Sequence, residues 1–269
     1  MKLDVYDFEG EKKSSIELSE EYNVSLRPDV IRRAVLYLQS LLRQPYGSKE
    51  KAGMRHSADL SRRRRKYRGS YGKGISRVPR KILSRRGLNF VWVGAVAPGT
   101  VGGRRAHPPK AEKNWIKNIN KKERRLAIVS ALNAVFNREL VLERGHKAPE
   151  NYPFAIISDF ENVSKTKDAV KILESLGFKE ELERAKVKKV RAGKLKNRGR
   201  PYKKKKSLLV VVSENVPVKD ALSNVPGVDV VRYDELNALL LAPGTHYGRI
   251  TLFTDKALNS LIEKKLFLN

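Results

Sequence analysis

Residues 208–213 read Leu-Leu-Val-Val-Val-Ser, an apolar run of strand length, and a helical pattern follows at 218–222. Three further apolar runs, at 154–158, 228–231 and 250–254, are each followed by a helical pattern in the same way. Continuous apolar strands that alternate with helices are typical of a parallel sheet covered by helices. The sequence therefore predicts an α/β fold with a mostly parallel sheet flanked by helices.

The remaining predicted elements lie nearer the N-terminus. Residues 3–8 and 14–18 alternate apolar and polar side chains, which predicts a hairpin or two edge strands. Apolar residues recur at helical spacing within 28–45, where one proline can open the helix and another stops it. A further helix is expected from Asn120, whose side chain can cap it while Glu123 reaches back.

The net charge of +28 is confined to two segments. Residues 43–110 hold 19 Lys and Arg against two acids, and residues 187–206 hold 11 against none. All other residues together carry 27 basic and 27 acidic side chains, so they are neutral as a group. Because Lys and Arg that meet phosphates release condensed counterions, this distribution indicates a polyanionic partner.

The first basic segment cannot bury a core of its own. It contains 10 of the 18 glycines and 5 of the 12 prolines, with one short apolar run at 90–93. A stretch of this length is either disordered alone or ordered by a partner. We expect a discontinuous globular body from 1–42 and 111–269, an extended loop at 43–110, and a basic insertion at 187–206 within the body.

Arginine, glycine and tyrosine interleave in the extended loop. Residues 62–68 place six cations in seven positions, a run that by itself is also typical of a solvated tail or a nuclear-import patch. Glycine lets the backbone approach phosphates, arginine grips them with two donors, and Tyr67 and Tyr71 can stack on unpaired bases. This combination favours structured RNA. The residues predicted to bind RNA are Arg55, Arg62, Arg63, Arg64, Arg65, Lys66, Tyr67, Arg68, Tyr71, Lys73, Arg77, Arg80, Lys81, Arg85, Arg86, Arg104, Arg105, His107, Lys110, Lys188, Lys189, Arg191, Lys194, Lys196, Arg198, Arg200, Lys203 and Lys204.

Nucleotide-binding loops fit the glycines poorly. Gly72-Lys73-Gly74 lacks the third glycine of a dinucleotide fingerprint, and Lys73 is not followed by the Ser or Thr of a Walker loop. The sequence Gly-Gly-Arg-Arg at 102–105 is either a flexible turn or a backbone nest for phosphate.

Catalytic and metal-binding patterns are weak. Asp159 and Glu161 follow an apolar strand, where such acids are most often a helix cap or a solvated loop. The chain has no cysteine, and its four scattered histidines lack metal-ligand spacing. We therefore expect no enzyme activity, cofactor, metal or small-molecule substrate. No apolar stretch approaches the ~20 residues of a membrane span, so we expect no membrane partner.

Three stretches resemble one known family. They are the glycine-basic loop at 69–80, the sequence Gly-Gly-Arg-Arg-Ala-His-Pro-Pro at 102–109 followed by Trp115 and 120–132, and the basic run at 190–200. Together with the order of strands and helices they cover nearly the whole chain. The chain is similar to ribosomal protein four of the large subunit, in its archaeal and eukaryotic form.

The resemblance implies an α/β body on the large subunit and an extension threaded into ribosomal RNA. It implies a non-enzymatic constituent of cytoplasmic ribosomes that supports assembly, with large-subunit rRNA and neighbouring ribosomal proteins as partners. In the family the tip of the extension reaches the wall of the nascent-peptide exit tunnel. Carried over by motif, the tip that would meet the nascent peptide comprises Gly72, Lys73, Gly74, Ile75, Ser76 and Arg77.

Two alternatives from other classes stay open on the residues alone. One is an RNA-modifying enzyme with an α/β catalytic body, which would bind a small cofactor or alter RNA. The other is a basic chromatin or transcription protein, which would prefer duplex DNA.

Limited proteolysis tests the predicted division of the chain. Because the basic segments lack a core, trypsin should cut the free protein within 43–110 and 187–206 while the body resists. Mass spectrometry of the early fragments locates the cuts. Uniform resistance in the absence of RNA would contradict the division.

Overall fold

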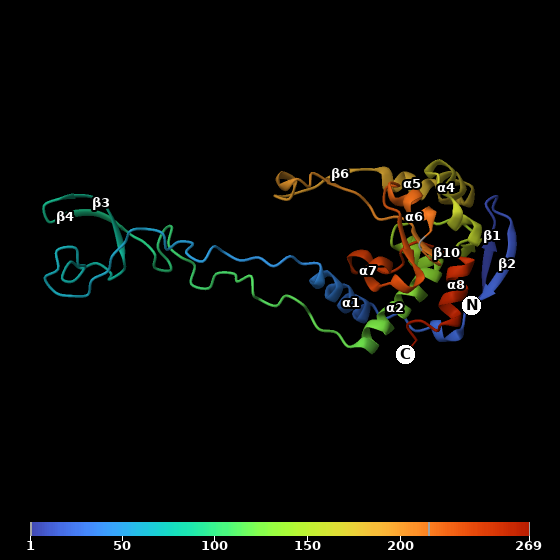
Figure 1. Cartoon of the computed structure of the whole chain (residues 1–269), viewed down its shortest axis with the longest axis horizontal. Coiled ribbons are helices and arrows are strands. Elements are labelled where there is room, and N and C mark those ends of the chain that lie inside the picture. Colours follow the sequence, from blue (N-terminus) through green and yellow to red (C-terminus); the bar gives the residue numbers. More distant parts are fainter. Residues whose placement is uncertain (1, 215, 269) are drawn as a thin grey trace. The chain divides into compact units, whose positions relative to one another are not determined.

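The computed structural model describes residues 2–214 and 216–268. It forms two compact units (Figure 1). The first, here called the body, comprises Met1–Leu42 and Ile116–Asn269; the second, here called the arm, comprises Arg43–Trp115. The arm starts where the expected loop starts and ends five residues after it.

A six-stranded sheet forms the centre of the body (Figure 1). Its strands are β1 (Lys2–Tyr6), β2 (Lys12–Glu17), β5 (Phe154–Ile156), β8 (Leu209–Val212), β9 (Asp229–Arg232) and β10 (Thr251–Thr254). They are arranged in the order β2-β1-β5-β10-β8-β9. Only the edge pair β1–β2 is antiparallel; the other pairs are parallel, which confirms the predicted α/β fold.

The register of the strands explains why the inner strands β5 and β8 are apolar throughout. Val5, Ala155, Phe253, Val211 and Val231 pair in one row across five strands. Paired residues lie on one face of a sheet, and the residues before and after them lie on the other. Because helices cover both faces, neither set is solvated in the inner strands β5, β8 and β10, and inner strands of a parallel sheet are typically apolar on both faces.

Two hydrophobic clusters fill the spaces on the two faces. The row through Ala155 packs with α1 (Pro28–Leu41), α2 (Lys121–Phe136), α7 (Ala238–Leu241) and α8 (Asp255–Glu263). The opposite face packs with α3 (Arg138–Glu143), α4 (Thr166–Leu173), α5 (Lys179–Lys186) and α6 (Pro217–Ser223). The body is therefore a three-layer structure.

The start of α2 differs from the sequence expectation. Helix α2 begins after Asn120 as predicted, but the Asn120 side chain makes no capping hydrogen bond. Glu123 instead forms an ion pair with Arg33 of the neighbouring helix α1, with Oε1 2.7 Å from the guanidinium nitrogen. The predicted capping box is therefore wrong, because a contact between helices takes the glutamate.

Glu161 also differs from its expected role as a cap or a solvated loop residue. Its buried carboxylate accepts hydrogen bonds from the Ser213 amide at 2.7 Å, the Ser213 hydroxyl, and the Thr254 hydroxyl at 2.6 Å. Ser213 follows β8 and Thr254 ends β10. The carboxylate thus ties together the carboxyl ends of neighbouring strands, where α/β enzymes usually keep their sites.

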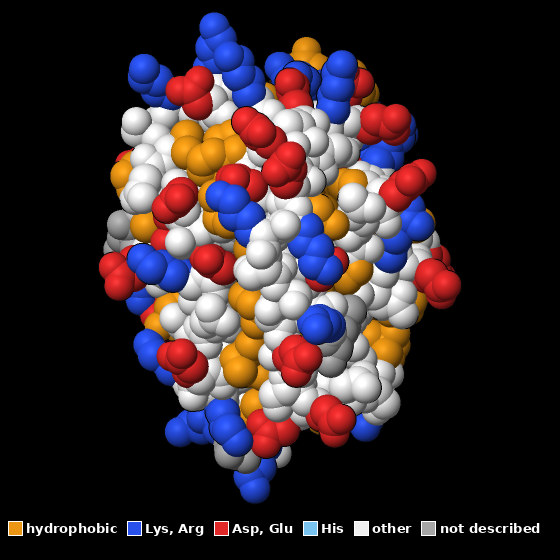
Figure 2. All heavy atoms as spheres, turned by 90° about the vertical axis from the view of Figure 1, so that its right-hand side faces the viewer, with side chains coloured by type: hydrophobic (Ala, Val, Ile, Leu, Met, Phe, Trp, Pro, Cys, Tyr) orange, Lys and Arg blue, Asp and Glu red, His pale blue; other side chains and the backbone are white. Residues whose placement is uncertain are grey.

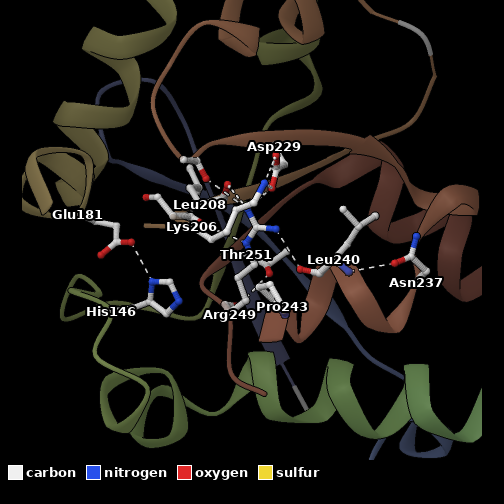
Figure 3. A network of polar contacts seen from close by, with 12 residues as sticks. His146, Glu181, Lys206, Leu208, Asp229, Asn237, Leu240, Pro243, Arg249 and Thr251 are labelled. Atoms are coloured by element: carbon white, nitrogen blue, oxygen red, sulfur yellow. Dashed lines mark hydrogen bonds and ion pairs between the residues drawn. The ribbon is translucent and has the colours of Figure 1, made fainter. Parts of the chain in front are cut away.

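A buried arginine holds the end of the basic insertion (Figure 3). Arg249 is 1% exposed, and its guanidinium donates to the carbonyl oxygens of Ser207 at 2.8 Å and Leu240 at 3.0 Å, and to the Asp229 carboxylate at 2.6 Å. Asp229 also binds Lys206, the last residue of the insertion, at 2.8 Å. Burial tends to raise the pKa of Asp229, but these two cations outweigh it and lower the pKa.

A second buried network lies on α5, just before the insertion. Glu181 accepts hydrogen bonds from the Arg184 guanidinium at 2.8 Å and the Lys147 amide at 3.0 Å. Its carboxylate also lies 2.8 Å from the ring nitrogen of His146, a contact drawn in Figure 3. Burial alone would raise the Glu181 pKa, but these partners lower it to about 2. Arg184 also donates to the Lys206 carbonyl at 2.9 Å, so both networks converge on that residue.

Substitution of Arg249 tests how the body supports the insertion. Arg249→Met should lower the free energy of unfolding by about 3–5 kcal/mol, because it leaves the Asp229 carboxylate and several carbonyl groups without their buried donor. Lys206→Met, which removes the exposed partner of the same carboxylate, should cost less than about 1 kcal/mol. Urea unfolding followed by circular dichroism measures both, and equal small losses would contradict the assignment.

Candidate nucleic-acid interface

The body offers no continuous basic surface on the face in Figure 2, where acidic and basic side chains are interspersed. This arrangement agrees with the neutral composition of the residues outside the two basic segments. The arm, in contrast, carries 20 Lys and Arg against three acids. A polyanion therefore meets its strongest attraction at the arm and at the basic insertion.

An antiparallel hairpin organises the arm. Its strands are β3 (Arg80–Arg86) and β4 (Asn89–Gly94), joined through Gly87. The register pairs Ile82 with Trp92 and Arg85 with Phe90, so both aromatic rings of β4 project from one face. Among the described arm residues, Ala95 is the only buried hydrophobic one, which agrees with a segment that lacks a core.

Aromatic rings and cations gather on that face of the hairpin. The rings of Phe90 and Trp92 stack with centroids 5.2 Å apart, and the Lys73 ammonium lies 4.9 and 5.0 Å from them. The rings of Tyr67 and Phe90 form a T-shaped pair with centroids 5.1 Å apart, and Tyr67 donates its hydroxyl proton to the Gly87 carbonyl at 2.6 Å. Lys73 and Tyr67, which are both predicted to bind RNA, thus lie against a pair of aromatic rings that the prediction did not include.

The expected tip is a turn that closes back on the hairpin. Gly72 and Gly74 have φ of +78° and +68°, values that favour glycine, and a Cβ at either would lie in open space. Lys73 between them reaches the two rings described above. Arg80 donates to the Ser76 carbonyl at 2.6 Å. The glycines are needed here for their backbone conformation, and contact with a phosphate is not their only explanation.

The arginine run at 62–68 is exposed along its length. Arg64 donates to the Tyr71 hydroxyl at 3.1 Å, and the guanidinium carbons of Arg64 and Arg77 lie 5.2 and 4.8 Å from the Tyr71 ring centre. Lys66 pairs with Asp59 at 3.2 Å, one of the few acids in the arm. The Tyr71 ring therefore holds cations in the free protein.

The glycine pair at 102–103 forms a tight turn. A Cβ on Gly103 would collide with the Ala97 carbonyl and the Thr100 hydroxyl, so only glycine fits. The amides of Gly103 and Arg104 donate to the carbonyls of Thr100 at 3.0 Å and Val96 at 3.1 Å. Because these donors are used within the arm, the structure supports the turn and not a phosphate nest.

The basic insertion forms a small hairpin of its own. Strands β6 (Lys189–Val190) and β7 (Tyr202–Lys203) pair antiparallel. Arg191 is half-buried and donates to the carbonyls of Arg200 at 3.2 Å and Tyr202 at 3.3 Å. The other predicted RNA-binding residues of the insertion are exposed. Arg191 therefore helps to shape the hairpin, while its neighbours offer their charges to solvent.

The structure also shows aromatic residues that the sequence prediction missed. Phe90 and Trp92 were recognised only as an apolar run, although their alternation with valine is a strand signal. Tyr46 and Trp115 stack although 69 positions separate them, and nothing in the local sequence marks that contact. Arg43, which lies over Trp115, was missed for the same reason.

Metal-binding clusters and membrane-spanning helices are both absent from the described part of the chain. Within residues 2–214 and 216–268, no group of three or more His, Asp or Glu side chains could hold a metal ion. Over the same residues no helix is both long and apolar enough to cross a bilayer. Glu161, which lies at the carboxyl ends of two strands, already accepts three hydrogen bonds from the fold.

Comparison with known proteins gives a consistent result. The ribosomal protein L4/L1 family matches residues 16–264. Large ribosomal subunit protein uL4 of Nanoarchaeum equitans is 46% identical over 268 residues, which cover 99% of this chain and 100% of that protein. The protein of the same name from Archaeoglobus fulgidus is 44% identical, with 98% and 99% covered, and that from Pyrobaculum aerophilum is 45% identical, with 99% and 90% covered.

Proposed function

Because the chain belongs to the ribosomal protein L4/L1 family, we infer that it is a structural, non-enzymatic constituent of the large ribosomal subunit. It associates there with rRNA and with other ribosomal proteins. The observation that carries this function is the confinement of the net charge to the arm and the basic insertion, which makes both suited to RNA. The finer roles that follow are proposals about how it acts.

The arm and the basic insertion bind rRNA through their exposed cations. The arginine run at 62–68 and the lysines at the end of the insertion face solvent, so they can reach phosphates without unfolding the chain. Arginine holds a phosphate with two parallel hydrogen bonds, which positions the RNA as well as attracting it. By neutralising phosphates where RNA segments crowd together, these cations support assembly of the subunit.

The body provides the folded core to which both segments are covalently joined. Its core orders the residues that flank the arm, and Arg249 and Glu181 fix the end of the insertion. Because the body is neutral, it adds little non-specific attraction for RNA. Binding energy is thus concentrated in the segments that enter the RNA.

The turn at 72–77 contributes to the wall of the nascent-peptide exit tunnel. Support comes from the resemblance of its glycine-basic motif to the family and from its geometry, since both glycines border open space. Such a turn can line a narrow passage without a bulky side chain at its glycines.

Salt dependence tests the electrostatic mode of binding. If about ten phosphate contacts form, affinity for large-subunit rRNA should fall roughly 10³- to 10⁵-fold between 50 and 200 mM monovalent salt. The double variant Arg85→Gln/Arg86→Gln should weaken binding and flatten the slope of log affinity against log salt by about one to two. The matched body variant Lys167→Gln/Lys171→Gln should leave the slope unchanged. A salt-independent affinity for rRNA would refute this mode.

Site-specific crosslinking tests the tunnel role. The chain has no cysteine, so Ser76→Cys gives a single attachment point for a photoreactive group. In reconstituted ribosomes carrying a stalled, radiolabelled nascent chain, this group should crosslink to the nascent peptide. The exposed body position Ser164→Cys should yield no such product. Crosslinks from Ser76→Cys to rRNA alone would show that the tip lies elsewhere.

A further inference from the structure

The two ends of the arm meet beside a cavity that is open to solvent. The Ser48 amide donates to the Pro109 carbonyl at 3.1 Å, and a Cβ on Gly47 would lie only 2.9 Å from the Ala111 amide nitrogen. This close approach brings Tyr46 against Trp115, which is the last residue of the arm. The cavity beside them, here called the root cavity, has a volume of about 640 Å³.

A stacked aromatic pair lines the root cavity. The rings of Tyr46 and Trp115 lie 5.3 Å apart between centroids and only 20° from parallel. The Arg43 guanidinium carbon is 3.8 Å from the centre of the indole, and the Lys113 ammonium is 4.5 Å from it. An aromatic pair with cations beside it is the arrangement on which nucleic-acid bases stack.

The polar lining of the root cavity is mainly cationic. Arg105, Lys110 and Lys113 line it together with His107, against a single acid, Glu112. Pro108 and Pro109 form the rest of the lining and limit the motion of the backbone there. The volume falls in the range of pockets that hold small organic groups, about 300–1,000 Å³.

The indole N–H of Trp115 is a buried donor without a partner among the described residues of the free protein. Across residues 2–214 and 216–268, only Trp115 Nε1 and Ser207 Oγ are buried side-chain polar atoms without a hydrogen-bond partner. A buried donor left unpaired is unfavourable, so native proteins rarely retain one. The atom is closed to solvent in the free protein, so an acceptor on a bound nucleotide would reach it only if the residues around the cavity rearranged on binding.

We propose that the root cavity binds one unpaired nucleotide of RNA. The base stacks on the Tyr46–Trp115 pair, and its phosphate meets Arg105, Lys110 and Lys113. An apolar peptide would leave Arg105, Lys110 and Lys113 without an anionic partner. A base that is paired within a duplex could not leave its stack to reach the aromatic pair. The proposal rests on the rRNA-binding function and adds to it a site that selects an unstacked base.

A contact that merely closes the arm would behave differently. If Tyr46 and Trp115 only hold its two ends together, loss of the indole should weaken all RNAs alike. A nucleotide site predicts a loss restricted to RNAs that present an extruded base. The two roles are therefore separated by ligands that differ in one base and nothing else.

The test uses the full-length protein and two RNA hairpins of equal length, each with one bulged position. One hairpin carries a normal nucleotide there, and the other carries an abasic residue with the same phosphate. The variant Trp92→Phe makes Trp115 the only tryptophan, so its fluorescence reports the cavity. The normal bulge should bind roughly 5- to 100-fold more tightly and quench Trp115, as expected for stacking of one base.

Substitutions at the cavity complete the experiment. Trp115→Leu should reduce the preference for the normal bulge to less than about 2-fold and leave the salt slope unchanged, whereas Trp115→Phe should keep most of the preference. Equal binding of the two hairpins with a steep salt slope overturns this proposal but not rRNA binding; a flat slope overturns rRNA binding itself. Equal weakening of both hairpins by Trp115→Leu, or equally strong quenching by a glutamate-rich peptide, also overturns the nucleotide site.

Discussion

The arrangement of this protein depends on one electrostatic constraint: a segment rich in cations and nearly free of acids cannot order itself with ion pairs. The arm has 20 Lys and Arg against three acids, and the basic insertion has 11 against none. Like charges that are brought close in a fold repel one another unless an opposite charge intervenes. Order in these segments must come from their connection to a folded body, from interactions that need no acid, or from a polyanion.

At the basic insertion, order comes from the first of these sources, the connection to the folded body. Lys206 lies where two buried networks converge, one through Asp229 and Arg249 and the other through Arg184 and Glu181. In each network an acid with a lowered pKa, Asp229 or Glu181, forms ion pairs with nearby cations. These ion pairs fix one end of the insertion. Acids missing from the insertion itself are thus provided just outside it.

The sequence predicts the body well because its elements follow local rules. The apolar runs at 208–213 and 250–254 could be read as parallel strands without knowing their neighbours. What failed depends on contacts between distant residues: Glu123 pairs with Arg33 instead of capping its own helix, and Glu161 accepts hydrogen bonds from the ends of two other strands. No local pattern encodes such partners.

The candidate binding residues of the arm show the same limit: contacts between distant residues are not encoded in the local sequence. Its cations are evident in the sequence, since charge needs no partner to be recognised. The Tyr46–Trp115 pair and the gathering of Lys73 on Phe90 and Trp92 exist only once the backbone has folded. Composition therefore predicts the class of ligand, whereas the places where a base could dock require the structure.

Aromatic rings replace the missing acids inside the arm. Arg64 and Arg77 lie near Tyr71, and Arg43 lies over Trp115. An exposed cation–π contact contributes only about 0.5–1 kcal/mol, less than a typical charge-assisted hydrogen bond to phosphate at about 1.5–3 kcal/mol. Such contacts can shape the free arm and still be exchanged when RNA arrives. A cation that moved to a phosphate would expose its ring to a base, so under the proposed function the interactions that organise the arm also suit it to binding.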